Sequence, residues 1–212
     1  MKLRITEMFL SLQGETRTVG IPTVFIRLTG CPLRCQYCDT AYAFQGGEMM
    51  DIHAILEQVK SFGAQFVTVT GGEPLAQKAC LILLEQLCDG GYQVSLETSG
   101  AISLEAVDSR VVKVMDIKTP ASEESHRNDW QNLNYLLPQD QIKFVICDRN
   151  DYEWAKETLL ARQLHHLCEV LFSPSYEQIS PVLLADWILE DRLPVRFQMQ
   201  LHKLLWGDAR GK

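Results

Sequence analysis

Residues 31–40 read Cys31-Pro32-Leu33-Arg34-Cys35-Gln36-Tyr37-Cys38-Asp39-Thr40, so three cysteines stand within eight residues. Three thiolates this close together can hold three corners of a metal site or of an iron–sulfur cluster. A structural zinc site takes four protein ligands, and an ordinary iron–sulfur cluster takes four cysteines. Because the loop offers three, one metal position stays open for chemistry unless a fourth residue arrives from elsewhere.

The alternative for this loop is a zinc knuckle or a set of reactive thiols. A knuckle needs a fourth ligand, and the near candidates are His53 and Cys80. Neither belongs to a paired C-x2-C or H-x3-H unit. The other cysteines, Cys80, Cys88, Cys147 and Cys168, are expected to be buried apolar side chains.

Composition limits the classes of protein to which the chain can belong. Its 212 residues are 46% hydrophobic, which predicts a single domain over residues 1–212 with a substantial core. A net charge of −7 argues against binding along a nucleic-acid backbone. No apolar run of about 18 residues suggests a membrane span, and the N-terminus shows no signal peptide. Seven cysteines without a disulfide pattern indicate a reducing compartment, hence the cytoplasm.

Further along, short apolar strands alternate with helices. Strands are predicted over 3–10, 23–29, 66–70, 92–97, 111–116, 141–146, 169–172 and 195–201, and helices over 52–61, 75–88, 150–164 and 181–190. The helix at 150–164 is expected to bury Trp154, Leu159 and Leu160, and residues 121–136 are expected to form a loop with a short helix. This alternation predicts an α/β fold with a parallel sheet. About six β/α units are too few for an eight-unit barrel of about 250 residues, so we expect a partial, open barrel of the (β/α)6 type.

Polar residues follow the predicted strands at their carboxyl ends, which is the ligand-binding edge of such folds. They include Gln13-Gly14-Glu15, Gly71-Gly72-Glu73-Pro74 and Glu97-Thr98-Ser99. Arg27 lies within an apolar strand, where a lone charge is costly unless it is paired. It is either an edge charge or an anion-binding group, and we favour the second interpretation.

The pattern Cys-x3-Cys-x-aromatic-Cys resembles the cluster loop of radical S-adenosylmethionine (SAM) enzymes. In that family the open iron of a 4Fe–4S cluster binds SAM. The resemblance implies one such cluster on Cys31, Cys35 and Cys38, and the fold of the radical SAM superfamily. It also implies a set of SAM contacts: Tyr37, Cys38, Asp39, Gly72, Glu73, Glu97, Asp116 and Lys118.

Five motifs in order, from Leu12-Gln13-Gly14-Glu15 to Gln200-Leu201-His202-Lys203, are similar to one branch of this family. That branch converts 6-carboxy-5,6,7,8-tetrahydropterin to 7-carboxy-7-deazaguanine with loss of ammonia, in queuosine biosynthesis. The resemblance implies Mg²⁺ on Thr40, a homodimer, and an external one-electron reductant such as a flavodoxin. It implies that the pterin contacts Leu12, Gln13, Gly14, Glu15, Arg27, Thr70 and His202.

The chain departs from this branch at two places. Asp116-Ile117-Lys118 stands where Ser-Pro-Lys is common, and the tail runs past His202-Lys203 to Lys212 instead of ending soon after. Two other functions remain open: a different radical SAM reaction, such as a glycyl-radical activase, and a non-catalytic iron–sulfur or zinc protein. The first needs neither Arg27 nor His202, and the second has no use for polar residues at the strand ends.

Overall fold

The computed structural model describes residues 1–211; Lys212, where the predicted domain ends, lies outside the described residues. These residues form one nine-stranded sheet with the order β3-β1-β2-β4-β5-β6-β7-β8-β9. The strands are β1 (Lys2–Leu12), β2 (Pro22–Leu28), β3 (Glu48–Asp51), β4 (Phe66–Gly71), β5 (Gln93–Thr98), β6 (Val112–Asp116), β7 (Gln141–Ile146), β8 (Glu169–Pro174) and β9 (Arg196–Phe197).

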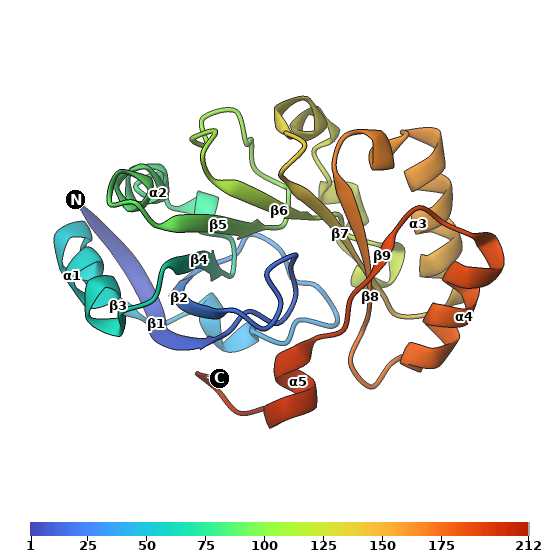
Figure 1. The fold of residues 1–212 in the computed structure, drawn as a ribbon, viewed down its shortest axis with the longest axis horizontal. Helices are drawn as coiled ribbons and strands as arrows, with labels where there is room; N and C mark the ends of the chain where they lie inside the picture. Colours follow the sequence, from blue (N-terminus) through green and yellow to red (C-terminus); the bar gives the residue numbers. More distant parts are fainter. Residues whose placement is uncertain (212) are drawn as a thin grey trace.

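The sheet is parallel from β2 to β9, as the alternation of strands and helices predicts. Strand β1 pairs antiparallel with both β2 and β3. Because β3 and β9 are the two edges and do not pair with each other, the sheet is an open arc rather than a closed barrel. Figure 1 shows this arc, and the prediction of an open α/β barrel is confirmed.

Four helices cover the outer side of the arc in Figure 1: α1 (Ile52–Phe62), α2 (Cys80–Asp89), α3 (Arg149–Ala161) and α4 (Pro181–Asp191). Their apolar faces and the outward side chains of the strands make one hydrophobic core. Helix α1 begins where predicted, because the Asp51 carboxylate accepts a hydrogen bond from the His53 amide. It ends at Gly63, whose φ of 69° is the left-handed conformation that glycine adopts easily.

The structure corrects the predicted start of the second helix. Helix α2 begins at Cys80 rather than at residue 75, because a separate 3-10 turn, Pro74–Ala76, precedes it. Gln77 then has an extended backbone, and its side chain bonds the backbone of Arg4 and the Thr29 carbonyl. These tertiary hydrogen bonds outweigh the local helical preference.

Two other expectations are wrong, and one strand is missing from the prediction. The last predicted strand shrinks to β9, since the chain leaves the sheet after Gln198, and Leu201–Trp206 forms helix α5 instead. Strand β3 was not predicted, because its pairing with β1 is non-local. Leu160 is exposed, although Leu159 is buried as expected and Trp154 packs partly against the core.

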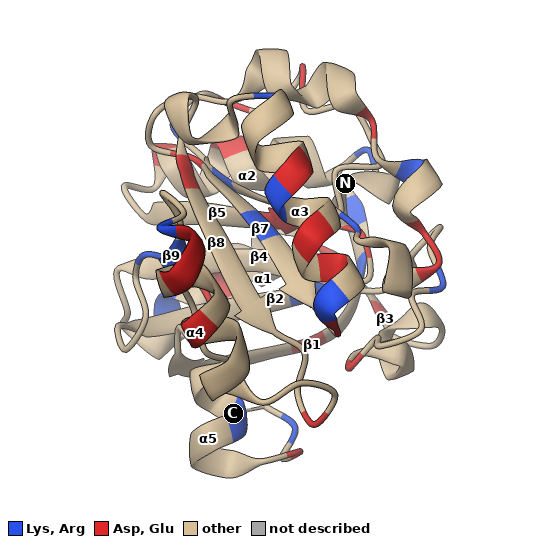
Figure 2. Cartoon of the chain, turned by 90° about the vertical axis from the view of Figure 1, so that its right-hand side faces the viewer, with Lys and Arg blue, Asp and Glu red and all other residues tan. Residues whose placement is uncertain are grey.

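Most charged residues visible in Figure 2 lie on the helices and loops. Figure 2 shows that α3 carries both acidic and basic residues, whereas the strands of the sheet are mostly uncharged. Cys80, Cys147 and Cys168 are buried as predicted, and Cys88 is half-buried. Among the described residues, no helix has the length and apolar character that crossing a membrane requires.

Candidate active site

The cysteine loop lies at the carboxyl end of β2, on the inner side of the arc. It starts at Gly30, whose φ of 99° allows the chain to turn out of the strand. Gly30 donates to the Ala43 carbonyl and accepts from the Glu73 amide, so the start of the loop is held from two sides. Leu33 is buried and anchors the middle of the loop. The three cysteines are half-buried and line one pocket.

The arrangement of the cysteines fits a cluster better than a single metal ion. Thiolates on one tetrahedral zinc ion lie about 3.8 Å apart. Among the described residues, the three cysteine sulfurs do not all lie within 4.8 Å of one another. The side chains that do meet this distance are Glu15, Asp39 and His202. Burial raises the pKa of Cys35 to about 11, so its thiolate needs a bound cation such as iron. Of the cysteines that the structure describes, only Cys31, Cys35 and Cys38 line the pocket.

Gly72 permits the close packing of β4 against this loop. A Cβ atom at Gly72 would lie 2.4 Å from the Gly30 carbonyl oxygen and 2.7 Å from the Cys31 Cβ. A larger residue at this position therefore displaces the cysteine loop. This explains the glycine pair at the end of β4 without any ligand.

Glu73 lies outside the pocket lining, unlike the other predicted SAM contacts. Its carboxylate is fully buried and accepts hydrogen bonds from the Leu75 amide, the Thr98 hydroxyl and the Ser99 amide. These contacts occupy both carboxylate oxygens. The Glu73 side chain therefore links the end of β5 to the start of the 3-10 turn through hydrogen bonds. This structural role differs from the SAM contact that the resemblance implies for its carboxylate.

All other predicted site residues line a single pocket of about 370 Å³ at the carboxyl ends of the strands. The SAM contacts in its lining are Tyr37, Cys38, Asp39, Gly72, Glu97, Asp116 and Lys118. The predicted substrate contacts there are Leu12, Gln13, Gly14, Glu15, Arg27, Thr70 and His202, together with Thr40. Residues from almost the whole length of the chain therefore meet at one place.

A network of charges crosses the pocket floor. Lys118 Nζ lies 3.1 Å from Asp116 Oδ2, and the same oxygen lies 3.6 Å from Lys143 Nζ. Lys143 Nζ also donates to Glu15 Oε2 at 2.8 Å. Burial raises the pKa of Glu15, but the charges of Lys143 and His202 outweigh burial and lower this pKa to about 2. Glu15 is therefore ionised at neutral pH.

Asp116 and Tyr37 retain unused polar atoms. Asp116 Oδ1 and the Tyr37 hydroxyl are buried without a hydrogen-bond partner among the described residues. The Lys118 ammonium lies 5.9 Å from the centre of the Tyr37 ring. A buried acceptor without a donor is costly, so Asp116 is suited to receive a donor from a bound ligand.

Glu97 projects from the end of β5 and is held by two donors. Gln13 Nε2 lies 3.2 Å from Glu97 Oε1, and the Thr70 hydroxyl donates to Oε2 at 3.1 Å. Burial raises the pKa of Glu97. The carboxylate is thus oriented in the pocket by residues of β4 and of the turn after β1.

Arg27 is paired within the protein. Its Nε donates to Glu7 Oε1 at 2.7 Å, and the Tyr42 hydroxyl donates to the same oxygen at 2.7 Å. This pairing orients the guanidinium, whose terminal nitrogens have no hydrogen-bond partner among the described residues and can form the fork that suits a carboxylate ligand.

The tail completes the pocket. Gln200 Nε2 donates to Glu15 Oε1 at 3.0 Å, and His202 Nδ1 lies 3.7 Å from the same oxygen. The Arg210 guanidinium lies 4.2 Å from the centre of the Tyr42 ring. Glu15 and Asp39 offer carboxylate oxygens, and His202 offers an imidazole nitrogen, within 4.8 Å of one another. The Thr40 hydroxyl, which also lines the pocket, is 3.8 Å from Cys38 Sγ. This donor set is compatible with a hard cation.

The sequence reasoning missed Lys143, Glu7 and Tyr42. Lys143 stands in an apolar strand, which is the same signal that singled out Arg27. Glu7 lies opposite Arg27 in the antiparallel register of β1 and β2, so this partner required the pairing to be known. Tyr42 belongs to a short 3-10 helix, Ala41–Phe44, in which no local pattern indicates a role.

Comparison with known proteins places the chain among radical SAM enzymes. A family model described as "Radical SAM superfamily" matches residues 25–125. The 7-carboxy-7-deazaguanine synthase of Chlorobaculum tepidum is 44% identical, and the alignment covers 99% of this chain and 97% of that protein. The synthase of Koribacter versatilis is 42% identical, with 96% and 97% covered. The fold is also similar to QueE from Escherichia coli, with a TM-score of 0.79, 24% identity and 95% of each chain covered.

Proposed function

This chain belongs to the 7-carboxy-7-deazaguanine synthases, a family of radical SAM enzymes, and from that premise we propose how its pocket performs the reaction. The enzyme converts 6-carboxy-5,6,7,8-tetrahydropterin to 7-carboxy-7-deazaguanine and releases ammonia, as a carbon–nitrogen lyase of queuosine biosynthesis. The assignment of roles rests on one observation: every predicted ligand residue except Glu73 lines the same pocket.

Cys31, Cys35 and Cys38 would hold the 4Fe–4S cluster in this proposal, and the cysteine loop and the residues at the ends of β5 and β6 would line the SAM site. The reduced cluster with bound SAM would supply the radical chemistry that removes a hydrogen atom from the pterin. Lys118 and Asp116 face the amino-acid part of SAM, and Glu97 accepts from its ribose hydroxyls. Asp39 and the backbone of Gly72 complete the cofactor site. The unused Asp116 Oδ1 atom supports this arrangement.

The pterin occupies the other half of the pocket. Arg27 pairs with the substrate carboxylate, and Glu15 accepts from the N–H groups of the pterin ring. Leu12, Gln13, Gly14, Thr70 and His202 orient the ring and exclude water. The Arg27–Glu7 pair supports this proposal, because it directs the guanidinium before the substrate arrives.

Mg²⁺ is proposed at Thr40, where substrate oxygens and waters supply most of its ligands. The carboxylate oxygens of Glu15 and Asp39, which lie within 4.8 Å of each other, support a cation in the pocket. Thr40→Ala is expected to reduce the stimulation of turnover by Mg²⁺. If Mg²⁺ stimulates turnover of the variant as much as turnover of the wild type, the assignment of Mg²⁺ to Thr40 is wrong.

Residues 1–212 are proposed to act as one domain, as a cytoplasmic homodimer reduced by an external one-electron donor such as a flavodoxin. Exposed apolar side chains on α4 and α5 offer a surface for a second copy: Val182, Leu189, Leu204 and Leu205. Sedimentation velocity at several concentrations tests the dimer.

The decisive experiment is an anaerobic assay. The cluster is first reconstituted in the protein. Dithionite, SAM, Mg²⁺ and 6-carboxytetrahydropterin are then added, and the products are identified by mass spectrometry. The proposal expects a deazaguanine carboxylic acid without stoichiometric loss of SAM. Accumulation of 5′-deoxyadenosine with unchanged pterin would instead favour a different radical SAM substrate, as in an activase.

A further inference from the structure

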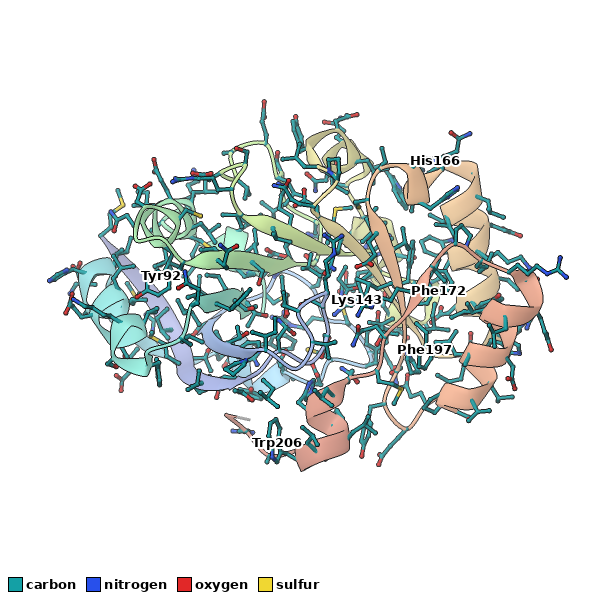
Figure 3. The ribbon with its side chains drawn as sticks, in the orientation of Figure 1. Tyr92, Lys143, His166, Phe172, Phe197 and Trp206 are labelled. Atoms are coloured by element: carbon teal, nitrogen blue, oxygen red, sulfur yellow. The ribbon has the colours of Figure 1, made fainter. Side chains whose placement is uncertain are left out.

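Lys143 is a buried lysine in the middle of a parallel strand. It lies in β7 between Ile142 and Phe144, whose side chains are fully buried, and it is itself 7% exposed. Figure 3 shows Lys143 near the centre of the molecule, on the inner side of the arc. An ammonium group at such a position is costly unless carboxylates compensate it, so the reason for its presence lies in its contacts.

Those contacts join the two halves of the pocket. The Nζ atom lies 2.8 Å from Glu15 Oε2, in the turn after β1, and 3.6 Å from Asp116 Oδ2, at the end of β6. Asp116 has a second cation, Lys118, at 3.1 Å. For Glu15 the other contacts are weaker: a neutral donor, Gln200, at 3.0 Å and His202 at 3.7 Å. Lys143 is therefore the principal cation for Glu15, whereas Asp116 does not depend on it.

We propose that Lys143 is a positioning residue for the pterin: it holds the Glu15 carboxylate in the orientation that receives the donor edge of the substrate. This inference rests on the proposed function and assigns a role to a residue that the sequence motifs do not include. The Lys143 ammonium occupies Oε2, and Gln200 occupies Oε1, so the plane of the carboxylate is set from both sides.

Replacing Lys143 by an uncharged residue removes a positive charge on which three carboxylates act, those of Glu15, Glu97 and Asp116. Glu15 Oε2 then has lost the donor that fixes it, so the carboxylate is free to rotate and presents its acceptor atoms to the pterin less favourably. Because Lys118 still compensates Asp116, SAM binding is expected to change little. The effect is thus selective for one ligand of the same pocket.

The test is binding and kinetics of the reconstituted full-length protein with SAM present. The probe is 6-carboxypterin, an oxidised analogue of the substrate, and its affinity is measured by isothermal titration calorimetry. Lys143→Met is expected to weaken pterin binding about tenfold or more, since a charge-assisted contact is lost. In turnover assays KM for the pterin rises more than kcat falls, and Lys143→Arg restores part of the affinity.

Lys113→Met is the matched control. Lys113 is a lysine of the neighbouring strand β6, 2% exposed and 3.0 Å from the buried Asp140, but it does not line the pocket. Its replacement lowers the melting temperature without changing pterin affinity. If Lys143→Met does not fold, Lys143→Gln takes its place.

Two results would overturn the inference: pterin affinity of the Lys143 variant within twofold of the wild type, or an equal loss in the Lys113 variant. Failure of the wild type itself to bind the probe or convert the pterin would instead remove the proposed function.

Discussion

Gly72 is the residue at which the sheet and the cysteine loop come closest. The atoms that a Cβ would meet, the Gly30 carbonyl oxygen and the Cys31 Cβ, belong to the backbone or lie next to it, so they cannot rotate away. The glycine therefore determines how near the first cysteine stands to the end of β4. Packing of the loop, rather than a ligand, requires it.

Gly72→Ala is expected to destabilise the fold by about 2 kcal/mol, as overpacking does, and to lower the iron content after reconstitution. Denaturant titration and iron analysis measure the two effects. Gly90→Ala is the control, because φ there is −72° and the nearest contact is a Tyr92 ring carbon at 3.3 Å. Full iron loading of the Gly72 variant would contradict this account.

Glu15 is expected to make the free energy of unfolding depend on pH. Its pKa is about 2 in the folded protein, below the ordinary value of 4.5. A group with a lowered folded pKa stabilises the fold fully above its unfolded pKa, and this contribution is lost as the pH falls from about 4.5 toward 2. Glu15→Gln is expected to flatten the pH dependence of the free energy of unfolding in this window. Parallel curves for the two proteins would refute the expectation.

Helix α3 fixes, through hydrogen bonds of its first turn, the loop that follows β6 and Lys118. Asp151, in its first turn, accepts hydrogen bonds from the Thr119 hydroxyl, the Ala121 amide and the Cys147 amide. The same loop after β6 provides the Ser122 carbonyl, which accepts from the Gln36 amide. The amino end of α3 thereby holds the segment that follows Lys118 against the cysteine loop.

Asp151→Ala is expected to cost about 3 kcal/mol of stability, because it leaves buried donors without an acceptor. Asp148→Ala removes the N-cap of the same helix, which bonds the Asp151 amide at 2.8 Å, and should cost about 1 kcal/mol. Urea titrations compare the two variants. Equal losses would mean that Asp151 acts only on its own helix.

Over the whole molecule, the tail closes a pocket that the sheet leaves open. Helix α5 contains no buried residue, yet it follows Gln200 and brings His202 and Lys203 to the pocket lining. Figure 1 shows α5 and the end of the described chain on the open side of the arc. The tail therefore contributes to the site more than to the core.

A chain that ends at Gln200 is expected to keep its melting temperature within a few degrees and to bind a cluster. Its KM for the pterin should rise at least tenfold, because His202 and the closing wall are absent. Calorimetry and the product assay measure these outcomes. Unchanged KM would show that the pocket is complete without α5.

Part of the site could be predicted from local signals, and the resemblance to radical SAM enzymes implied the roles of the other residues. The cysteine spacing, the glycine pair and the polar strand ends all stand in short segments, and an open parallel sheet brings such segments to one edge. The prediction failed where the signal was ambiguous. Residues 195–201 alternate like a strand, but after Gln198, whose amide still donates to the Phe172 carbonyl of β8, the chain turns to the Gly14 carbonyl, which accepts from the Leu201 amide.

Local patterns thus determined the α/β class, the open barrel and the cysteine loop, and the ligand residues that the family resemblance implied line the pocket with the exception of Glu73. The tertiary structure decided which charges meet: Glu7 beside Arg27, Lys143 between Glu15 and Asp116, and Glu73 buried behind β5 instead of facing a ligand. The physical reason is that ion pairs depend on strand register and on contacts between residues as far apart as Glu15 and Lys143, and no local spacing encodes those distances.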